Sequence, residues 1–176
     1  MIAIEEIIRK IQEFASEISS QPLCQAQHQP EVQARPKCCF QNVWEKVAKD
    51  GGEILFGWTF SHRINPQYGD YVMATHHAVW CAPDNKLIDV TPFTDDPKHH
   101  PFTLGKYVLF LVDESAQPVE QGNLIAPLPL KYFALSNSQE LKEYVNKLAE
   151  QEQKACQELY DGKITSAQIS GIFFKT

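Results

Sequence analysis

A β-hairpin is predicted over residues 70–91, where the sequence is DYVMATHHAVWCAPDNKLIDVT. Residues 70–81 contain the β-branched and aromatic side chains typical of a strand, and the stretch 82–85 has the proline, aspartate and asparagine of a turn. We expect a short strand to return over 86–91 and to end at Pro92, because proline has no N–H to donate to a sheet. This hairpin decides which side chains share a face of the sheet.

Further strands are predicted on both sides of the hairpin. Residues 53–60, EILFGWTF, precede it and residues 107–112, YVLFLV, follow it, and both runs have the composition of strands. Polar and turn-forming residues concentrate in the other stretches, which we expect to be irregular: 19–37, 61–69, 93–103, and 113–136 with a short strand near 123–125.

Three helices are predicted from apolar residues spaced three and four positions apart. The first covers residues 2–18 and the second covers 39–50. The third begins near Asn137, which has the spacing of a capping box with Glu140, and ends at Gly162. The order of elements predicts an α+β fold in which N-terminal helices pack on an antiparallel sheet beside a long C-terminal helix.

The whole chain, residues 1–176, is predicted to form one domain, because its length is close to that of a typical domain. Hydrophobic residues make up 43% of it, which favours a packed core over disorder. Large apolar side chains in the C-terminal tail are expected to pack on this core or on a partner: Ile164, Ile169, Ile172, Phe173 and Phe174.

Composition and charge exclude several classes of partner. The net charge of −6 provides no positive field for a phosphate backbone or an anionic membrane surface, so we expect neither nucleic acid nor a membrane as a partner. No apolar run approaches the roughly 18 residues of a membrane span. The N-terminal stretch MIAIEEIIRKIQEF lacks the basic start of a secretory signal, so we expect a cytoplasmic protein, with signal-independent export as an effector left open.

Three residues have the chemistry of a thiol nucleophile and its helpers. Cys39 begins the second predicted helix, where unpaired backbone N–H groups and the helix dipole favour the thiolate. His77 lies on the long strand of the hairpin and can exchange a proton with the thiol and with a leaving group. Asp89 lies on the return strand, and a carboxylate on the far ring nitrogen would orient the imidazole. Five cysteines cannot all pair in disulfides, so at least one thiol is free in the monomer.

The hairpin places a condition on this triad. Opposed residues of an antiparallel pair point to the same face, so His77 and Asp89 share a face only if the loop between the strands has an odd number of residues or the pair contains a bulge. A three-residue loop would put them directly opposite each other, and a five-residue loop would make them diagonal neighbours. A two-residue turn at Asp84-Asn85 would separate them, and Pro83 makes that turn less favourable.

Two stretches resemble the papain-like thiol hydrolase superfamily, which includes NlpC-like peptidases, transglutaminase-like proteins and glutamine deamidases. They are RPKCCFQNVWEKVAKDGGEILFGW at 35–58 and HHAVWCAPDNKLIDVTP at 76–92, and they are most similar to a group of short uncharacterised bacterial proteins. The resemblance covers residues 33–92. It implies a papain-like fold and a catalytic triad, and it marks these matched positions: Cys39, Asn42, Gly57, Trp58, His77 and Asp89.

The resemblance also implies groups that bind the oxyanion and the substrate. Papain-like enzymes place a side-chain amide a few residues before the cysteine, which points to Gln33, and the backbone N–H of Cys39 is a second donor. Asn42 and Trp58 complete the predicted oxyanion and substrate-binding set.

Alternatives remain for single residues and for the function. Cys38 is the alternative nucleophile, and His76, which points to the opposite strand face, is the alternative base. A zinc site could use Cys24 and His28 with Cys38 or Cys39, although their spacing is not that of a zinc finger. The fold could also serve as a catalytically silent binding module.

We therefore predict a cysteine-dependent hydrolase or acyl transferase that acts on a carboxamide, peptide or isopeptide bond through a thioester. No cofactor or metal is required for this chemistry. The partner is a protein, peptide or small amide substrate. The sequence leaves open the substrate itself, the choice among hydrolysis, deamidation and acyl transfer, and the oligomeric state.

Overall fold

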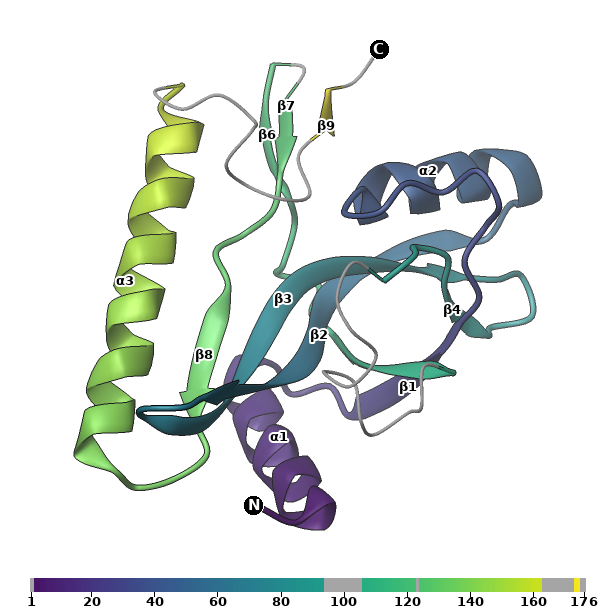
Figure 1. The fold of residues 1–176 in the computed structure, drawn as a ribbon. Coiled ribbons are helices and arrows are strands. Elements are labelled where there is room, and N and C mark those ends of the chain that lie inside the picture. The colour runs from purple at the N-terminus through teal and green to yellow at the C-terminus, as the bar shows by residue number, and fades with distance from the viewer. Residues whose placement is uncertain (1, 94–105, 123, 163–172, 175–176) are drawn as a thin grey trace.

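A long hairpin at the centre of the chain is the main element of the fold (Figure 1). Strands β2 (Glu53–Asn65) and β3 (Gly69–Cys81) pair antiparallel over their full lengths, which confirms the two strands predicted in these regions. The structure is a computed structural model, and it describes residues 2–93, 106–122, 124–162 and 173–174.

The connection between β2 and β3 is shorter than predicted. The loop expected over 61–69 is limited to residues 66–68, because β2 continues to Asn65. The side-chain oxygen of Asn65 accepts hydrogen bonds from the N–H groups of Gln67 and Tyr68, at 2.9 and 3.1 Å, and so closes the turn. The first residues of the stretch 61–69 are mostly polar, and for that reason they were predicted as loop rather than as the end of β2.

The larger sheet closes on itself. Its strand order is β2-β5-β1-β4-β3-β8 and β2 also pairs with β3, so five strands form a closed barrel and β8 extends β3 outside it (Figure 1). The other strands of this sheet are β1 (Leu23–His28), β4 (Leu87–Asp89), β5 (Tyr107–Val112) and β8 (Lys131–Ala134). The sheet is mixed rather than antiparallel as predicted, because β1 runs parallel to β4.

Strand β1 lies in the stretch 19–37, and the prediction that this stretch is irregular is wrong there. Along β1, Cys24 and Ala26 alternate with the exposed side chains of Gln25 and Gln27. The strand pairs with β5 on one side and with β4 on the other. The glutamines and the nearby prolines conceal a strand that is defined by its neighbours in the barrel rather than by its own propensity.

The barrel has a small apolar interior, and its closure depends on one glycine. Four buried side chains form a cluster there: Ala26, Val79, Val108 and Phe110. At Gly57 the strands approach so closely that a Cβ atom would lie 1.9 Å from the carbonyl oxygen of Leu111. Any side chain at this position would force β2 and β5 apart.

Two helices cover the outer surface of the barrel, as predicted. Helix α1 (Ile4–Ile18) buries Ile7, Ile11 and Phe14 in a cluster that includes Trp58. Helix α2 (Cys39–Asp50) packs on a second cluster, made with side chains of β3 and of the segment that follows β4. The two helices therefore cover different parts of the outer face (Figure 1).

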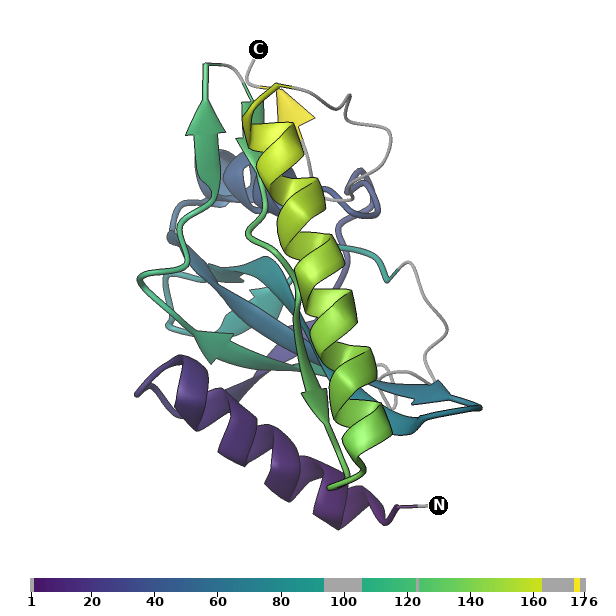
Figure 2. The ribbon, with the colours of Figure 1, turned by 90° about the vertical axis from the view of Figure 1, so that its left-hand side faces the viewer.

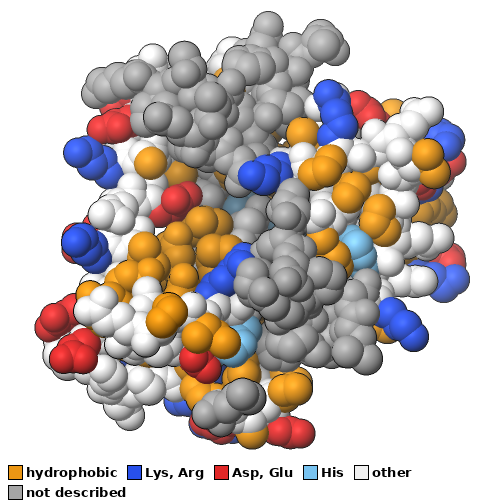
Figure 3. Space-filling view, viewed as in Figure 1, with side chains coloured by type: hydrophobic (Ala, Val, Ile, Leu, Met, Phe, Trp, Pro, Cys, Tyr) orange, Lys and Arg blue, Asp and Glu red, His pale blue; other side chains and the backbone are white. Residues whose placement is uncertain are grey.

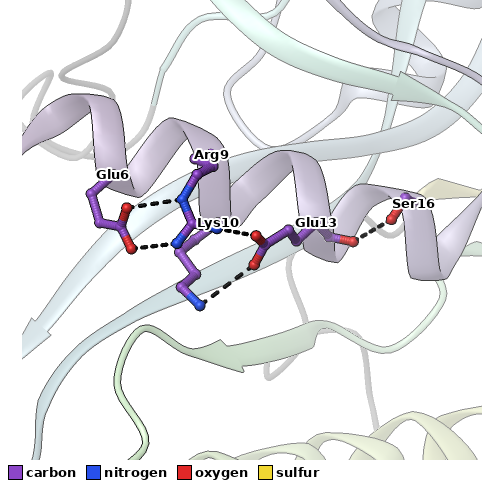
Figure 4. A network of polar contacts seen from close by, with 5 residues as sticks. All are labelled: Glu6, Arg9, Lys10, Glu13 and Ser16. Carbon is purple, nitrogen blue, oxygen red and sulfur yellow. Dashed lines mark hydrogen bonds and ion pairs between the residues drawn. The ribbon is translucent and has the colours of Figure 1, made fainter.

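The exposed side of α1 carries a chain of ion pairs (Figure 4). Arg9 donates to Glu6 at 2.9 Å through Nε and also pairs with Glu13, and Lys10 lies 3.4 Å from Glu13. These pairs are one helical turn apart and solvent-exposed, so they stabilise the helix only modestly.

The third helix, α3 (Gln139–Tyr160), packs against β8 (Figure 2). It begins one residue later than predicted, because Ser138 rather than Asn137 is the N-cap and accepts a hydrogen bond from the N–H of Leu141 at 3.4 Å. Tyr144 stacks on Tyr68 of the hairpin turn with ring centroids 4.7 Å apart. Hydrophobic side chains gather on the side of α3 that faces β8 (Figure 3).

A small second sheet lies beyond the barrel. It consists of β6 (Val119–Gln121), β7 (Leu124–Ala126) and β9 (Phe173–Phe174). Strand β7 confirms the short strand predicted near 123–125, whereas β6 and β8 were not predicted. Pairing of β9 with β7 docks that part of the tail on the fold, as expected. The other predicted tail residues, and most of the loop predicted over 93–103, lie outside the described residues. No described helix has both the length and the apolar character needed to cross a membrane.

We predict that Gly57→Ala destabilises the fold by about 3 kcal/mol or more, because the added methyl group would overlap the backbone of β5. Urea unfolding followed by circular dichroism would measure the change. Gly122→Ala is the control: Gly122 has a positive φ of 57°, and nothing lies within 4 Å of its missing side chain, so only the backbone cost of about 1 kcal/mol is expected. Equal losses in both variants would contradict the proposed role of Gly57 in barrel closure.

Candidate active site

Cys39 is the first residue of α2 and is almost completely buried. The helix is held in place by Phe40 and Val43, which pack on the outer face of the sheet. Cys38 stands just before the helix, as its N-cap residue. The thiol that interacts with the ring of His77 is that of Cys39.

The hairpin between β3 and β4 meets the condition placed on the triad. Cys81 pairs with Leu87 and Trp80 pairs with Ile88, so a five-residue loop joins the strands. The odd loop predicted for a shared face is confirmed, and His77 and its partner are diagonal neighbours. The Nε2 atom of His77 lies 3.1 Å from Oδ1 of Asp89, with 13% and 3% of the two side chains exposed.

The contact between His77 and Asp89 is an ion pair rather than a well-aligned hydrogen bond. The ring N–H does not point along the line between the two atoms, so Nε2 has no hydrogen-bond partner by geometry although the carboxylate is 3.1 Å away. Burial opposes a charge on the ring and lowers its pKa. The Asp89 carboxylate and the Cys39 thiol outweigh burial and raise the pKa of His77 well above its usual range.

The site lies where the sheet is open. On the edge of β3 away from β2, β8 pairs only with residues 71–74 and β4 only with residues 80–81. Within the described part of the chain, residues 75–79 have no strand on that edge. The side chain of His77 points to the same face as Val79 of the barrel interior, whereas α2 covers the outer face. Helix α2 lies on the outer face, and the gap beside residues 75–79 lets the Cys39 thiol contact His77, whose side chain points to the inner face.

His76 is a structural residue of the core. Its ring is 2% exposed and lies between Phe40 and Trp58, at centroid distances of 5.0 and 5.4 Å. Nδ1 accepts a hydrogen bond from the N–H of Leu128 at 2.8 Å, so Nε2 carries the proton that it donates to the carbonyl oxygen of Ala116 at 2.7 Å. Burial lowers the pKa of His76 to about 4, and the ring is neutral at pH 7.

Two of the three predicted substrate-binding residues, Gln33 and Trp58, have surroundings that do not indicate a substrate site. Gln33 is exposed, in a turn closed by the hydrogen bond from the N–H of Ala34 to Glu31. Trp58 is buried on the opposite face from His77, and its Nε1 donates to Asp113 at 2.9 Å. The backbone N–H of Cys39, at the start of α2, remains the donor that the geometry supports best for an oxyanion.

Asn42 is buried and its amide is fully occupied by the protein. Oδ1 accepts a hydrogen bond from the N–H of Arg35 at 3.0 Å, and Nδ2 donates to the carbonyl oxygen of Arg35 at 2.8 Å and to Oγ1 of Thr91 at 3.1 Å. Neither N–H of the amide is free for a substrate. Thr91 was not selected from the sequence. Its N–H donates to the side chain of Asp89, two residues earlier, and an aspartate at a turn is the sequence signal for such a local bond.

The residues of the alternative zinc site have other partners. The thiol of Cys24 donates to the carbonyl oxygen of Phe110 at 3.0 Å, and burial raises the pKa of this thiol. The ring of His28 contacts the carbonyl oxygen of Thr91 at 3.0 Å. Among the described residues, no three His, Cys, Asp or Glu side chains are arranged to hold a metal ion.

Comparisons with known proteins found no matching family model, no matching curated protein and no matching solved structure.

We predict that acid destabilises the fold through His76. Its pKa is about 4 in the folded protein and 6.5 in an ordinary environment, so the unfolded chain takes up the proton first. The neutral ring contributes fully to the free energy of unfolding above pH 6.5, and this contribution is lost as the pH falls toward 4. The free energy of unfolding should therefore fall by about 2 kcal/mol between pH 7 and pH 5. Urea unfolding at both pH values would measure it.

His76→Gln is the comparison variant for this experiment. It should be less stable than the wild type at pH 7 but should lose less stability between pH 7 and pH 5. The two proteins should differ in the stability that they lose between pH 7 and pH 5, and this difference is due to His76, because the carboxylates and His77 are present in both. An identical pH dependence of the two proteins would show that the His76 ring is not buried in its neutral form.

Proposed function

We propose that the protein is a cysteine-dependent hydrolase or acyl transferase of papain-like type, acting on a carboxamide, peptide or isopeptide bond. One observation carries the proposal: a buried histidine is contacted by the Cys39 thiol and also by the Asp89 carboxylate, 3.1 Å from its Nε2. A charged imidazole between a thiolate and a carboxylate is the resting state that thiol acyl transfer requires.

The first half of the reaction forms a thioester. The Cys39 thiolate attacks the carbonyl carbon of the substrate, and the carbonyl electrons move to oxygen, where the N–H of Cys39 at the start of α2 can stabilise the negative charge. As the tetrahedral intermediate collapses, the C–N bond breaks and the proton of His77 passes to the departing nitrogen. Amine or ammonia leaves, and the acyl group stays on sulfur.

The second half of the reaction releases the acyl group. His77, now neutral, takes a proton from water or from an acceptor amine as that nucleophile attacks the thioester. The C–S bond then breaks, and Cys39 leaves as the thiolate beside a protonated His77, so the starting state is restored. Water gives hydrolysis or deamidation, and an amine gives acyl transfer. No step needs a cofactor.

Asp89 supports His77 in both halves of the reaction. Its Oδ1 is held by the N–H of Thr91 at 3.0 Å while it faces His77, so the carboxylate cannot rotate away without losing a hydrogen bond. Because Nε2 of His77 faces this carboxylate, Nδ1 is the ring nitrogen left for the thiol and the substrate. The proposed substrate is a protein, a peptide or a small amide.

We predict that Cys39 is the most reactive of the five cysteines toward iodoacetamide near neutral pH, because its thiol contacts the ring of His77, which can take up the thiol proton. Mass spectrometry of tryptic peptides after brief labelling would rank the thiols. His77→Gln should slow labelling of Cys39 by about a hundredfold, the scale of a lost thiolate-stabilising partner. Cys38→Ser is the matched control and should label at the wild-type rate.

An activated acyl ester tests the covalent step in the same proteins. The wild type should retain an acyl group on Cys39, and Cys39→Ser should retain none and show no turnover while keeping its fold. Preferential labelling of Cys38 or Cys24 would contradict the assignment of the nucleophile. A reactive Cys39 that never becomes acylated would favour the catalytically silent binding module instead.

A further inference from the structure

We propose that Asn42 and Thr91 are positioning residues that together set the geometry between the Cys39 thiol and His77. The inference rests on the proposed function, because it assigns these residues a role in that chemistry rather than in binding a substrate. It begins from a set of buried hydrogen bonds that joins helix α2 to the turn after β4.

Asn42 holds the start of α2. It lies one helical turn after Cys39, and its amide bonds both the N–H and the carbonyl oxygen of Arg35. The turn that connects Arg35 to the helix contains Lys37, whose φ of 64° is unfavourable for a residue with a side chain. The amide therefore holds a strained turn closed, directly before the nucleophile.

Thr91 holds the carboxylate. Its N–H donates to Oδ1 of Asp89 at 3.0 Å, and its carbonyl oxygen contacts the ring of His28 at 3.0 Å. Its hydroxyl oxygen accepts the second N–H of Asn42 at 3.1 Å. Thr91 and Asn42 are each 5% exposed and Asp89 is 2% exposed, so water does not compete for these bonds.

These contacts form a closed ring. It runs from Cys39 through one turn of α2 to Asn42, then through Thr91 and Asp89 to His77, and returns to the thiol. Cys39 and His77 come from different layers of the fold, the covering helix and the barrel, which pack on each other through apolar side chains. The bond between Asn42 and Thr91 is a directional polar link between the two layers beside the site.

The test replaces the hydroxyl group of Thr91 while keeping its shape and its N–H. Thr91→Val should slow alkylation of Cys39 at pH 7 by about tenfold, because small displacements of reacting groups have effects of this order or larger. The pH–rate profile of alkylation should also change, because the geometry between the thiol and the ring of His77 is altered. Thr91→Ser restores the hydroxyl and should stay within about threefold of the wild-type rate.

Two further proteins make the test specific. Ser138→Ala removes a side-chain hydrogen bond at the start of α3, distant from Cys39 in the sequence, and should leave the rate and the pH profile unchanged. In an Asn42→Ala background, Thr91→Val should cause no further slowing, because the bond that it breaks is already absent. Additive slowing would show that Thr91 does not act through Asn42.

The outcome separates this inference from the proposed function. If Cys39 is reactive in a His77-dependent manner but Thr91→Val labels like the wild type, the positioning role is wrong and the proposed function stands. If Thr91→Val and Thr91→Ser slow labelling equally, the effect does not come from the hydroxyl group and the inference fails. If Cys39 is unreactive in the wild type, the proposed function itself fails.

Discussion

The pairing of the buried His77 ring with the Asp89 carboxylate is the constraint on which the arrangement of the candidate site depends. An imidazolium ion out of water is costly unless an anion compensates it, and here Asp89 lies 3.1 Å from one ring nitrogen while the Cys39 thiol contacts the ring as well. The carboxylate is available only because a five-residue loop puts β4 in the register that faces it toward His77. The thiol is available only because the sheet opens beside β3 and α2 begins at that opening.

Two adjacent histidines show how strand alternation assigns opposite roles to identical side chains. His76 points to the outer face, where two backbone groups fix one tautomer and burial keeps the ring neutral, with a pKa of about 4. His77 points to the other face, where a carboxylate raises its pKa. The first histidine ties Ala116 and Leu128 to the sheet, and the second is the residue that we propose for proton transfer. Because the side-chain period of a strand is two residues, a slip of one residue in register would exchange these roles.

Local patterns were sufficient to predict the helices and the strands of the hairpin over 70–91, because periodicity and turn residues act over a few positions. The odd number of residues in the loop of that hairpin was required by the triad rather than predicted from the turn residues. They were insufficient for β1 and for the closed barrel, since the Gln-rich strand gains its order from β4 and β5, which are distant in sequence. The same reason applies to the site. Cys39, His77 and Asp89 have recognisable chemistry, whereas the link between Asn42 and Thr91 exists only after α2 has packed on the barrel. Gln33 and Trp58 were selected by resemblance alone; Gln33 is exposed, and Trp58 is buried with its Nε1 bonded to Asp113.

Nitrogen-15 NMR of the histidine rings tests the central claim most directly. At pH 7 the ring of His77 should show two protonated nitrogens, and the ring of His76 should show a proton on Nε2 only; single His→Gln variants assign the two signals among the six histidines of the chain. Cys39→Ser should lower the pH at which His77 loses its proton, because the thiolate is then absent. A neutral His77 at pH 7 in the wild type, or a titration that Cys39→Ser leaves unchanged, would contradict the thiolate–imidazolium pair.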